Sequence, residues 1–137
     1  MVQILAGNKG EGKTKKLIEM ANDAIKEGNG HVVYIDDDNR HIYDLNFNIR
    51  FVETSEFPLA NYREFIGFIY GIFSQDNDIV KVFIDGIFKI VKKLDKEDII
   101  KLMTKLKEMS NTYSVDFVIA ANTDDTEIPD EIKDLLI

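Results

Sequence analysis

The chain of 137 residues contains no cysteine, and basic residues are in the minority. Without cysteine it cannot form a disulfide framework, a thiolate zinc site or a thiol nucleophile. Lysine and arginine together number 17 against 25 aspartates and glutamates, which gives a formal net charge of −8 at pH 7. Generic nucleic-acid binding depends on neutralising phosphates, so this charge makes nucleic acid an unlikely partner.

Long hydrophobic runs are also missing. The longest nearly apolar run, residues 65–73, is too short to span a bilayer. The chain enters a strand pattern at Val2 without the basic segment of a secretory signal. We therefore expect a cytoplasmic protein with no membrane association. With 45% hydrophobic residues, the length suits a single domain over residues 1–137.

The most specific motif is a glycine-rich stretch near the N-terminus. It comprises Gly7, Asn8, Lys9, Gly10, Glu11, Gly12, Lys13 and Thr14, followed by Lys15. The stretch fits the pattern G-x-x-x-x-G-K-[ST], and it stands between an apolar run and an amphipathic segment. Glycines let backbone N–H groups surround a phosphate, and the following helix adds free N–H donors and the positive end of its dipole. The pattern predicts that Lys13 reaches the β- and γ-phosphates of a nucleoside triphosphate and that Thr14 ligates Mg²⁺.

Strand and helix patterns alternate along the chain. Apolar residues recur at helical spacing from Leu17 to Ile25, and Gly28 is expected to end that helix. Further helices are expected at about 58–73, after an N-cap at Asp95, and after Pro129. Strands are expected at 2–6, 31–35, 79–85 and 115–121, with a weaker one at 49–53, whereas 42–48 is expected to be a loop. This alternation predicts an α/β fold, a three-layer sandwich around a mainly parallel sheet.

Polar residues follow several of these strands. Ligands bind at the carboxyl edge of parallel sheets, so residues after the strands are expected to converge there. They are the glycine-rich loop, the aspartates 36–38, Asp85, and Asn122 with Thr123. Asp85 ends the most strand-like run and is expected to hold Mg²⁺ through the waters of the ion. The alternative is a turn aspartate before Gly86.

On these residues the chain resembles the P-loop NTPases of the RecA-like group, which includes recombinases, circadian-clock ATPases and thymidine kinases. The resemblance implies that Asp85 is the second nucleotide-site motif and that Asn122 senses the γ-phosphate. In recombinases the carboxylate that activates water lies in a Phe-Ile-Asp-x-Glu context. The segment Tyr34 to Asp38 looks similar, which implies Asp38, or Asp37, as the base. The implied strand order is 2–6, 115–121, 79–85, 31–35, with 49–53 at the far edge.

The chain also departs from the pattern of that group. Many ATPases of the wider class, and thymidine kinases, carry a glutamate after the motif aspartate, where this chain has Gly86. The zinc-binding cysteines of thymidine kinases are missing. Compared with recombinases, the chain lacks room for a DNA-binding appendage.

The sequence therefore predicts a Mg²⁺-dependent ATP-binding protein that acts as a slow ATPase, with Lys13, Asp38 or Asp37, and Asn122 as its catalytic residues. ATP is favoured over GTP because residues 122–125 lack the lysine of an Asn-Lys-x-Asp guanine motif. One alternative is a nucleotide-binding switch or structural module without significant hydrolysis, which Gly86 favours. The other is a small-molecule kinase of thymidine-kinase-like type.

A pair of glycines bears on protein partners. Gly67 and Gly71 stand one turn apart on an expected helix rich in aromatic residues. Tight packing of this helix on the sheet is the favoured interpretation. A contact in a homo-oligomer or with another protein is the alternative.

Overall fold

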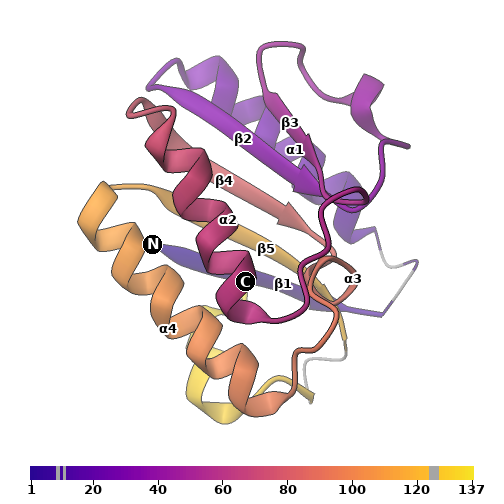
Figure 1. Cartoon of the computed structure of the whole chain (residues 1–137). Helices are drawn as coiled ribbons and strands as arrows, with labels where there is room; N and C mark the ends of the chain where they lie inside the picture. Colours follow the sequence, from indigo (N-terminus) through magenta and orange to yellow (C-terminus); the bar gives the residue numbers. More distant parts are fainter. Residues whose placement is uncertain (9, 11, 124–126) are drawn as a thin grey trace.

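A computed structural model describes residues 1–8, 10, 12–123 and 127–137. Its five strands are β1 (Val2–Gly7), β2 (His31–Asp36), β3 (Arg50–Glu53), β4 (Ile79–Asp85) and β5 (Asp116–Asn122). The α-helices are α1 (Lys13–Glu27), α2 (Tyr62–Ser74), α3 (Ile87–Ile90) and α4 (Lys96–Tyr113), with 3₁₀ helices η1 (Ile42–Asp44) and η3 (Asp130–Leu135). Figure 1 shows the strands running in one direction, as the alternating sequence pattern predicts.

The sheet is entirely parallel, and its order is β1-β5-β4-β2-β3. Strand β5 lies between β1 and β4, since Ile119 pairs with Ile4 on one side and Ile84 on the other. The predicted strand order is therefore confirmed, including the weak strand at the far edge. The α/β class and the parallel sheet are also confirmed.

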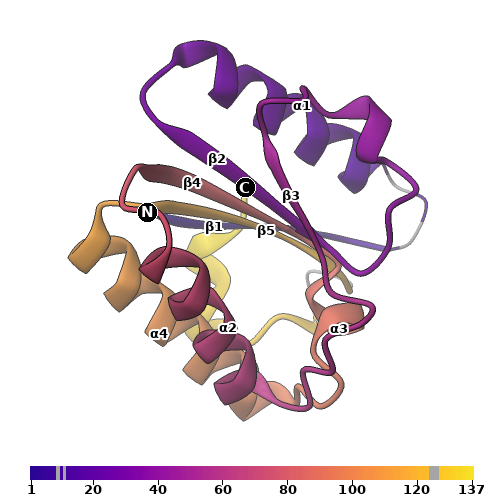
Figure 2. The ribbon, with the colours of Figure 1, turned by 45° about the horizontal axis from the view of Figure 1, so that its top comes forward.

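Helices cover both faces of the sheet (Figure 2). The two faces follow from the alternation of side chains along each strand. On one face, Leu17, Ala21 and other residues of α1 pack on a cluster that includes Tyr34 and Phe83. On the other face, the larger cluster joins α2, α4 and η3 to the sheet. The glycine-rich stretch therefore begins at the end of β1 and leads directly into α1, which covers this face of the sheet.

Two of the predicted helix ends agree with the structure, and one does not. As predicted, α1 ends at Gly28, which has φ +70°, and Asp95 caps α4 by accepting a hydrogen bond from the Asp98 backbone N–H. The expected start of α2 near Pro58 is wrong. The Asn61 side chain accepts a hydrogen bond from the Glu64 backbone N–H, so the helix begins at Tyr62.

Several smaller elements also differ from expectation. The short helix α3 was not predicted, the loop 42–48 contains η1, and the terminal helix after Pro129 is a 3₁₀ helix. Gly67 and Gly71 are exposed, and a Cβ at either position would meet no atom within 4 Å. The expected tight packing at these glycines is therefore wrong, because they do not approach the sheet. No helix among the described residues is long and apolar enough to cross a membrane.

Candidate functional site

The carboxyl edge of the sheet brings together polar residues from distant parts of the chain. Gly7 pairs with Asn122 across β1 and β5, so Asn122 lies beside the start of the glycine-rich loop. Ile35 pairs with Ile84 across β2 and β4, and each strand ends on the next residue, an aspartate. Asp36 and Asp85 thus end neighbouring strands in register, on the same face of the sheet as α1.

The glycine-rich loop is held by its own lysine. The Lys13 side chain is 9% exposed, and its Nζ donates a hydrogen bond of 2.8 Å to the Asn8 carbonyl oxygen. Gly12 has φ +80°, in the left-handed region, and precedes the first residue of α1. Among the other predicted loop residues, Gly10 and Lys15 are exposed, whereas Lys9 and Glu11 lie outside the described residues.

Thr14 joins this loop to β4. Its Oγ1 lies 3.4 Å from Asp85 Oδ1, a long hydrogen bond between residues that are 71 positions apart. The other oxygen of this carboxylate, Oδ2, accepts a hydrogen bond of 2.9 Å from the Tyr34 hydroxyl. Burial and the negative charge of Asp85 raise the pKa of Tyr34 well above its ordinary value, so the phenol keeps its proton and donates. Sequence analysis had not identified Tyr34 as a functional residue.

Asp36 is a second buried carboxylate that the sequence analysis did not single out within the aspartate block. It is 5% exposed, and its Oδ1 accepts a hydrogen bond of 2.7 Å from the Asp37 backbone N–H. Burial raises the pKa of Asp36 to about 8, with contributions from Asp37 and from the charge of Asp85. Without a bound cation, these surroundings therefore favour the protonated form of Asp36. The parallel between Tyr34-Ile35-Asp36 and Phe83-Ile84-Asp85 in the sequence could have revealed this pairing.

The two predicted base candidates differ in their surroundings. Asp37 lines a small polar pocket together with Thr14, Asp36 and Asp85. The side chain of Asp38 does not line this pocket, and its Oδ2 accepts a bond of 2.9 Å from Arg40 Nε. Burial acts to raise the pKa of Asp38, but hydrogen bonds from Arg40 and its charge outweigh burial and lower the pKa. The geometry therefore favours Asp37 over Asp38 as a group that faces a ligand.

The carboxylates of this pocket form no ion pair with the described cations. Among the described residues, no lysine, arginine or histidine lies within ion-pair distance of Asp36, Asp37 or Asp85. Arg40, His41 and Lys89 contribute to the wall of the pocket beyond that distance. Carboxylate and hydroxyl oxygens are the ligands that Mg²⁺ prefers, so the donor set fits this ion.

Asn122 stands between the polar pocket and a larger cavity of about 470 Å³. The larger cavity lies toward α3 and the start of α4, and its apolar walls are formed by Phe88, Leu94, Ile99, Ile128 and Pro129. Thr123, which follows Asn122, donates its hydroxyl to Glu127 at 2.6 Å. The volume of the larger cavity falls within the range of small-molecule sites. Asp124 and Asp125, which enter the guanine-motif argument, lie outside the described residues.

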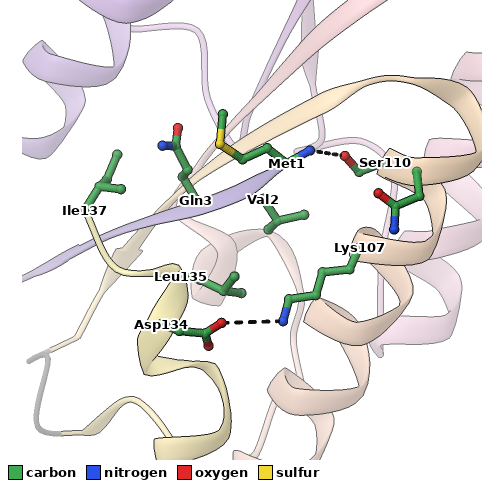
Figure 3. Close-up of a pocket in the computed structure, with 9 residues that line it drawn as sticks. Met1, Val2, Gln3, Lys107, Ser110, Asp134, Leu135 and Ile137 are labelled. Atoms are coloured by element: carbon green, nitrogen blue, oxygen red, sulfur yellow. Dashed lines mark hydrogen bonds and ion pairs between the residues drawn. The ribbon is translucent and has the colours of Figure 1, made fainter.

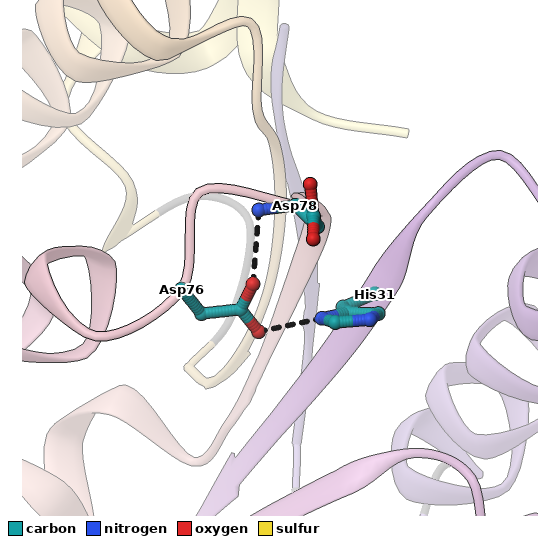
Figure 4. A group of neighbouring side chains, drawn as sticks. All are labelled: His31, Asp76 and Asp78. Atoms are coloured by element: carbon teal, nitrogen blue, oxygen red, sulfur yellow. Dashed lines mark hydrogen bonds and ion pairs between the residues drawn. The ribbon is translucent and has the colours of Figure 1, made fainter.

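Two other features lie away from the predicted residues. A cavity of about 400 Å³ opens near the start of β1, where the Met1 amine donates to Ser110 and Lys107 Nζ lies 4.0 Å from Asp134 (Figure 3). His31 and Asp76 meet near the start of β4, beside Asp78 (Figure 4). Neither group includes a residue that the sequence analysis assigned to a ligand.

Comparison of the sequence with protein-family models gives no match, and comparison with curated proteins gives no significant match. The functional argument therefore depends on this chain's own residues. Its strongest elements are the glycine-rich loop, the contact between Thr14 and Asp85, and the carboxylates that form no ion pair with any described residue.

Proposed function

We propose that this protein is a P-loop NTPase of the RecA-like group that binds Mg·ATP at the carboxyl edge of its sheet and hydrolyses it slowly. The observation that carries the proposal is the contact of 3.4 Å between Thr14 and Asp85. In the pattern G-x-x-x-x-G-K-[ST], the last hydroxyl ligates Mg²⁺, and a strand-end aspartate holds the same ion. A chance motif would give no reason for these two side chains to meet.

The residues fit both ligands chemically. Thr14 and Asp85 would hold Mg²⁺, and no described lysine, arginine or histidine pairs with Asp85 in place of the ion. When bound, Mg²⁺ neutralises charge on the β- and γ-phosphate oxygens. Lys13 is held at the loop by Asn8, where its ammonium group can meet the phosphates.

The remaining residues have separate roles in this proposal. Asn122 offers its amide to the γ-phosphate from the end of β5. Asp37 orients the attacking water, in preference to Asp38, because the Asp38 carboxylate is bonded to Arg40. Hydrolysis is slow because catalysis of this kind is positioning and charge stabilisation, and no glutamate follows Asp85. Gly86 has φ +78°, so a glutamate at this position would be strained.

Two alternatives have specific support. The missing glutamate favours a nucleotide switch that binds without significant hydrolysis. The cavity that meets the polar pocket at Asn122 favours a small-molecule kinase, since an acceptor there would lie next to the γ-phosphate. The three functions differ in phosphate release: an ATPase releases phosphate from ATP without an acceptor, a switch releases almost none, and a kinase transfers it only when an acceptor is present.

Calorimetry and a phosphate-release assay test the proposal. We expect ATP to bind more tightly with Mg²⁺ than in EDTA, to bind more tightly than GTP, and to be hydrolysed slowly without any acceptor. Asp85→Asn should weaken Mg·ATP binding by about tenfold or more and leave metal-free ATP binding almost unchanged. Binding without turnover would select the switch, and turnover only with an added metabolite would select the kinase. No binding of either nucleotide would refute the proposal.

A further inference from the structure

Tyr34 is a fully buried residue that the proposed nucleotide chemistry does not use directly. Its ring stacks between Phe51 and Phe83, with centroid distances of 6.3 and 6.4 Å. These contacts explain the ring but not the hydroxyl. The hydroxyl donates a hydrogen bond of 2.9 Å to Asp85 Oδ2, the oxygen that does not face Thr14.

The register of the sheet places Tyr34 opposite a phenylalanine, which has no hydroxyl. Tyr34 pairs with Phe83 across β2 and β4, so two aromatic rings occupy equivalent places two residues before the two aspartates. Phenylalanine is sufficient for packing at one of these places. At the other, the chain carries a buried phenol, and a buried phenol requires a hydrogen-bond partner.

We propose that Tyr34 is a positioning residue that fixes the Asp85 carboxylate for Mg²⁺. This inference rests on the proposed function, in which Asp85 holds the ion. The hydrogen bond to Oδ2 prevents the carboxylate from rotating and keeps Oδ1 directed toward Thr14. Outer partners of this kind orient metal-binding carboxylates, and their removal weakens metal binding even though they do not touch the metal.

A merely structural hydrogen bond predicts a different result. In that case, loss of the hydroxyl would change the stability of the protein and would affect ATP binding equally with and without Mg²⁺. The difference between these two affinities therefore separates positioning from packing.

The test compares Tyr34→Phe with Tyr113→Phe, which removes a hydroxyl from a half-exposed residue near the opposite end of the sheet. ATP affinity is measured by calorimetry in Mg²⁺ and in EDTA. We expect Tyr34→Phe to weaken Mg·ATP binding by about tenfold without changing metal-free ATP binding, and Tyr113→Phe to change neither. Unchanged Mg·ATP affinity in folded Tyr34→Phe, or equal losses in both conditions, would overturn the inference.

Asp85→Asn separates failure of the inference from failure of the proposed function. If Asp85→Asn loses the Mg²⁺ effect and Tyr34→Phe keeps it, only the role of Tyr34 is overturned. If the unmodified protein binds ATP no better with Mg²⁺, the metal role of Asp85 fails and the inference fails with it.

A measurement on the unmodified protein covers the case in which Tyr34→Phe does not fold. The chain has five tyrosines, so ¹³C labelling of the tyrosine ring carbon next to the hydroxyl gives a simple spectrum. Phenylalanine variants of the other four assign the Tyr34 signal by elimination. Adding Mg²⁺ to the ATP-bound protein should shift this signal more than the other four, and its failure to shift would overturn the inference.

Discussion

Strand β4 has a carboxylate near each end, and the two have different surroundings. Asp76 lies just before the strand, with a side chain that is 5% exposed, and it accepts bonds from His31 Nδ1 at 2.7 Å and the Asp78 backbone N–H at 2.9 Å (Figure 4). Arg50 also lies 3.6 Å from it. Asp85 ends the strand, and within the described part of the chain its side chain accepts only from the hydroxyls of Thr14 and Tyr34.

The comparison separates a structural carboxylate from one that suits a ligand. Burying a charge is costly unless it is paired, and at the first end the chain supplies the pairing itself. At the second end, Asp36 and Asp85 stand together, and the described part of the chain provides no ion pair for either. Two neighbouring strand-end carboxylates without an ion-pair partner among the described residues, one of them with a raised pKa, are a functional-site signature next to a loop suited to phosphates. The predictions below test this difference.

Removal of the Lys13 side chain should have the largest effect on ATP binding, because Lys13 belongs to the proposed phosphate site beside Asp85. Lys13→Ala should weaken ATP binding by about 3 kcal/mol, more than a hundredfold, since it leaves phosphate charge unpaired. The fold should persist, because Nζ is bonded only to a loop carbonyl among the described residues. Calorimetry and circular dichroism measure the two effects. Lys101→Ala, an exposed charge on α4, is the control. Equal ATP affinity in folded Lys13→Ala would refute the loop assignment.

The two neighbouring aspartates should differ in their effect on turnover. Asp37→Asn should lower the rate of ATP hydrolysis by about a hundredfold with little change in Mg·ATP affinity, the usual size of a lost base. Asp38→Asn should have a much smaller effect because its carboxylate is engaged by Arg40. A phosphate-release assay on the two matched variants decides the order. A greater loss in Asp38→Asn would restore the role that the family resemblance implies.

The fold was largely predictable from the sequence, and the fine structure of the site was not. Runs of apolar residues with the right period located all five strands, and the family resemblance implied the order that the structure has. Helix α2 was placed too early because Pro58 suits a helix start, whereas the cap that decides it is Asn61.

Most of the features of the site that the sequence analysis missed depend on which side chains bond to one another. The preference for Asp38 came from the resemblance of Tyr34–Asp38 to the recombinase segment, and a sequence resemblance cannot show that Arg40 bonds to that carboxylate. The role of the Tyr34 hydroxyl could not be predicted from the sequence, because its hydrogen-bond partner, Asp85, comes from another strand. Asp36 could have been found by aligning the ends of the two strands, which the predicted order already made neighbours.

Because of Asp36, the free energy of unfolding of the protein should fall as pH rises when Mg²⁺ is absent. The pKa of Asp36, about 8, lies above the unfolded value of about 3.9, so the native state binds the proton more tightly. The resulting stabilisation is complete below about pH 4 and decreases as pH rises through 8. Urea unfolding in EDTA across this range measures it, and Asp36→Asn should flatten the profile. A profile of equal slope in the variant would contradict the assignment.

Asp76, at the start of β4, should have the opposite effect on the pH dependence of the free energy of unfolding, and this effect should be the smallest of those predicted. Burial acts to raise the pKa of Asp76, but hydrogen bonds from His31 and Asp78 and the charge of Arg50 outweigh it, so the pKa is lowered. Its stabilisation is therefore present above the unfolded pKa of about 3.9 and is lost as pH falls through the lower folded value.

Asp76→Asn should accordingly lower the free energy of unfolding at pH 7 by about 1–3 kcal/mol, and the deficit should shrink in acid. Asp78→Asn is the matched control, because Asp78 contributes its backbone N–H to this group and the substitution keeps that donor. Urea unfolding at neutral and acid pH, with and without Mg²⁺, measures both variants. Because the chain supplies the partners of Asp76, Mg²⁺ should not change the deficit. A deficit that Mg²⁺ does change would mean that this end of β4 also binds a cation, and the distinction between the two ends would fail.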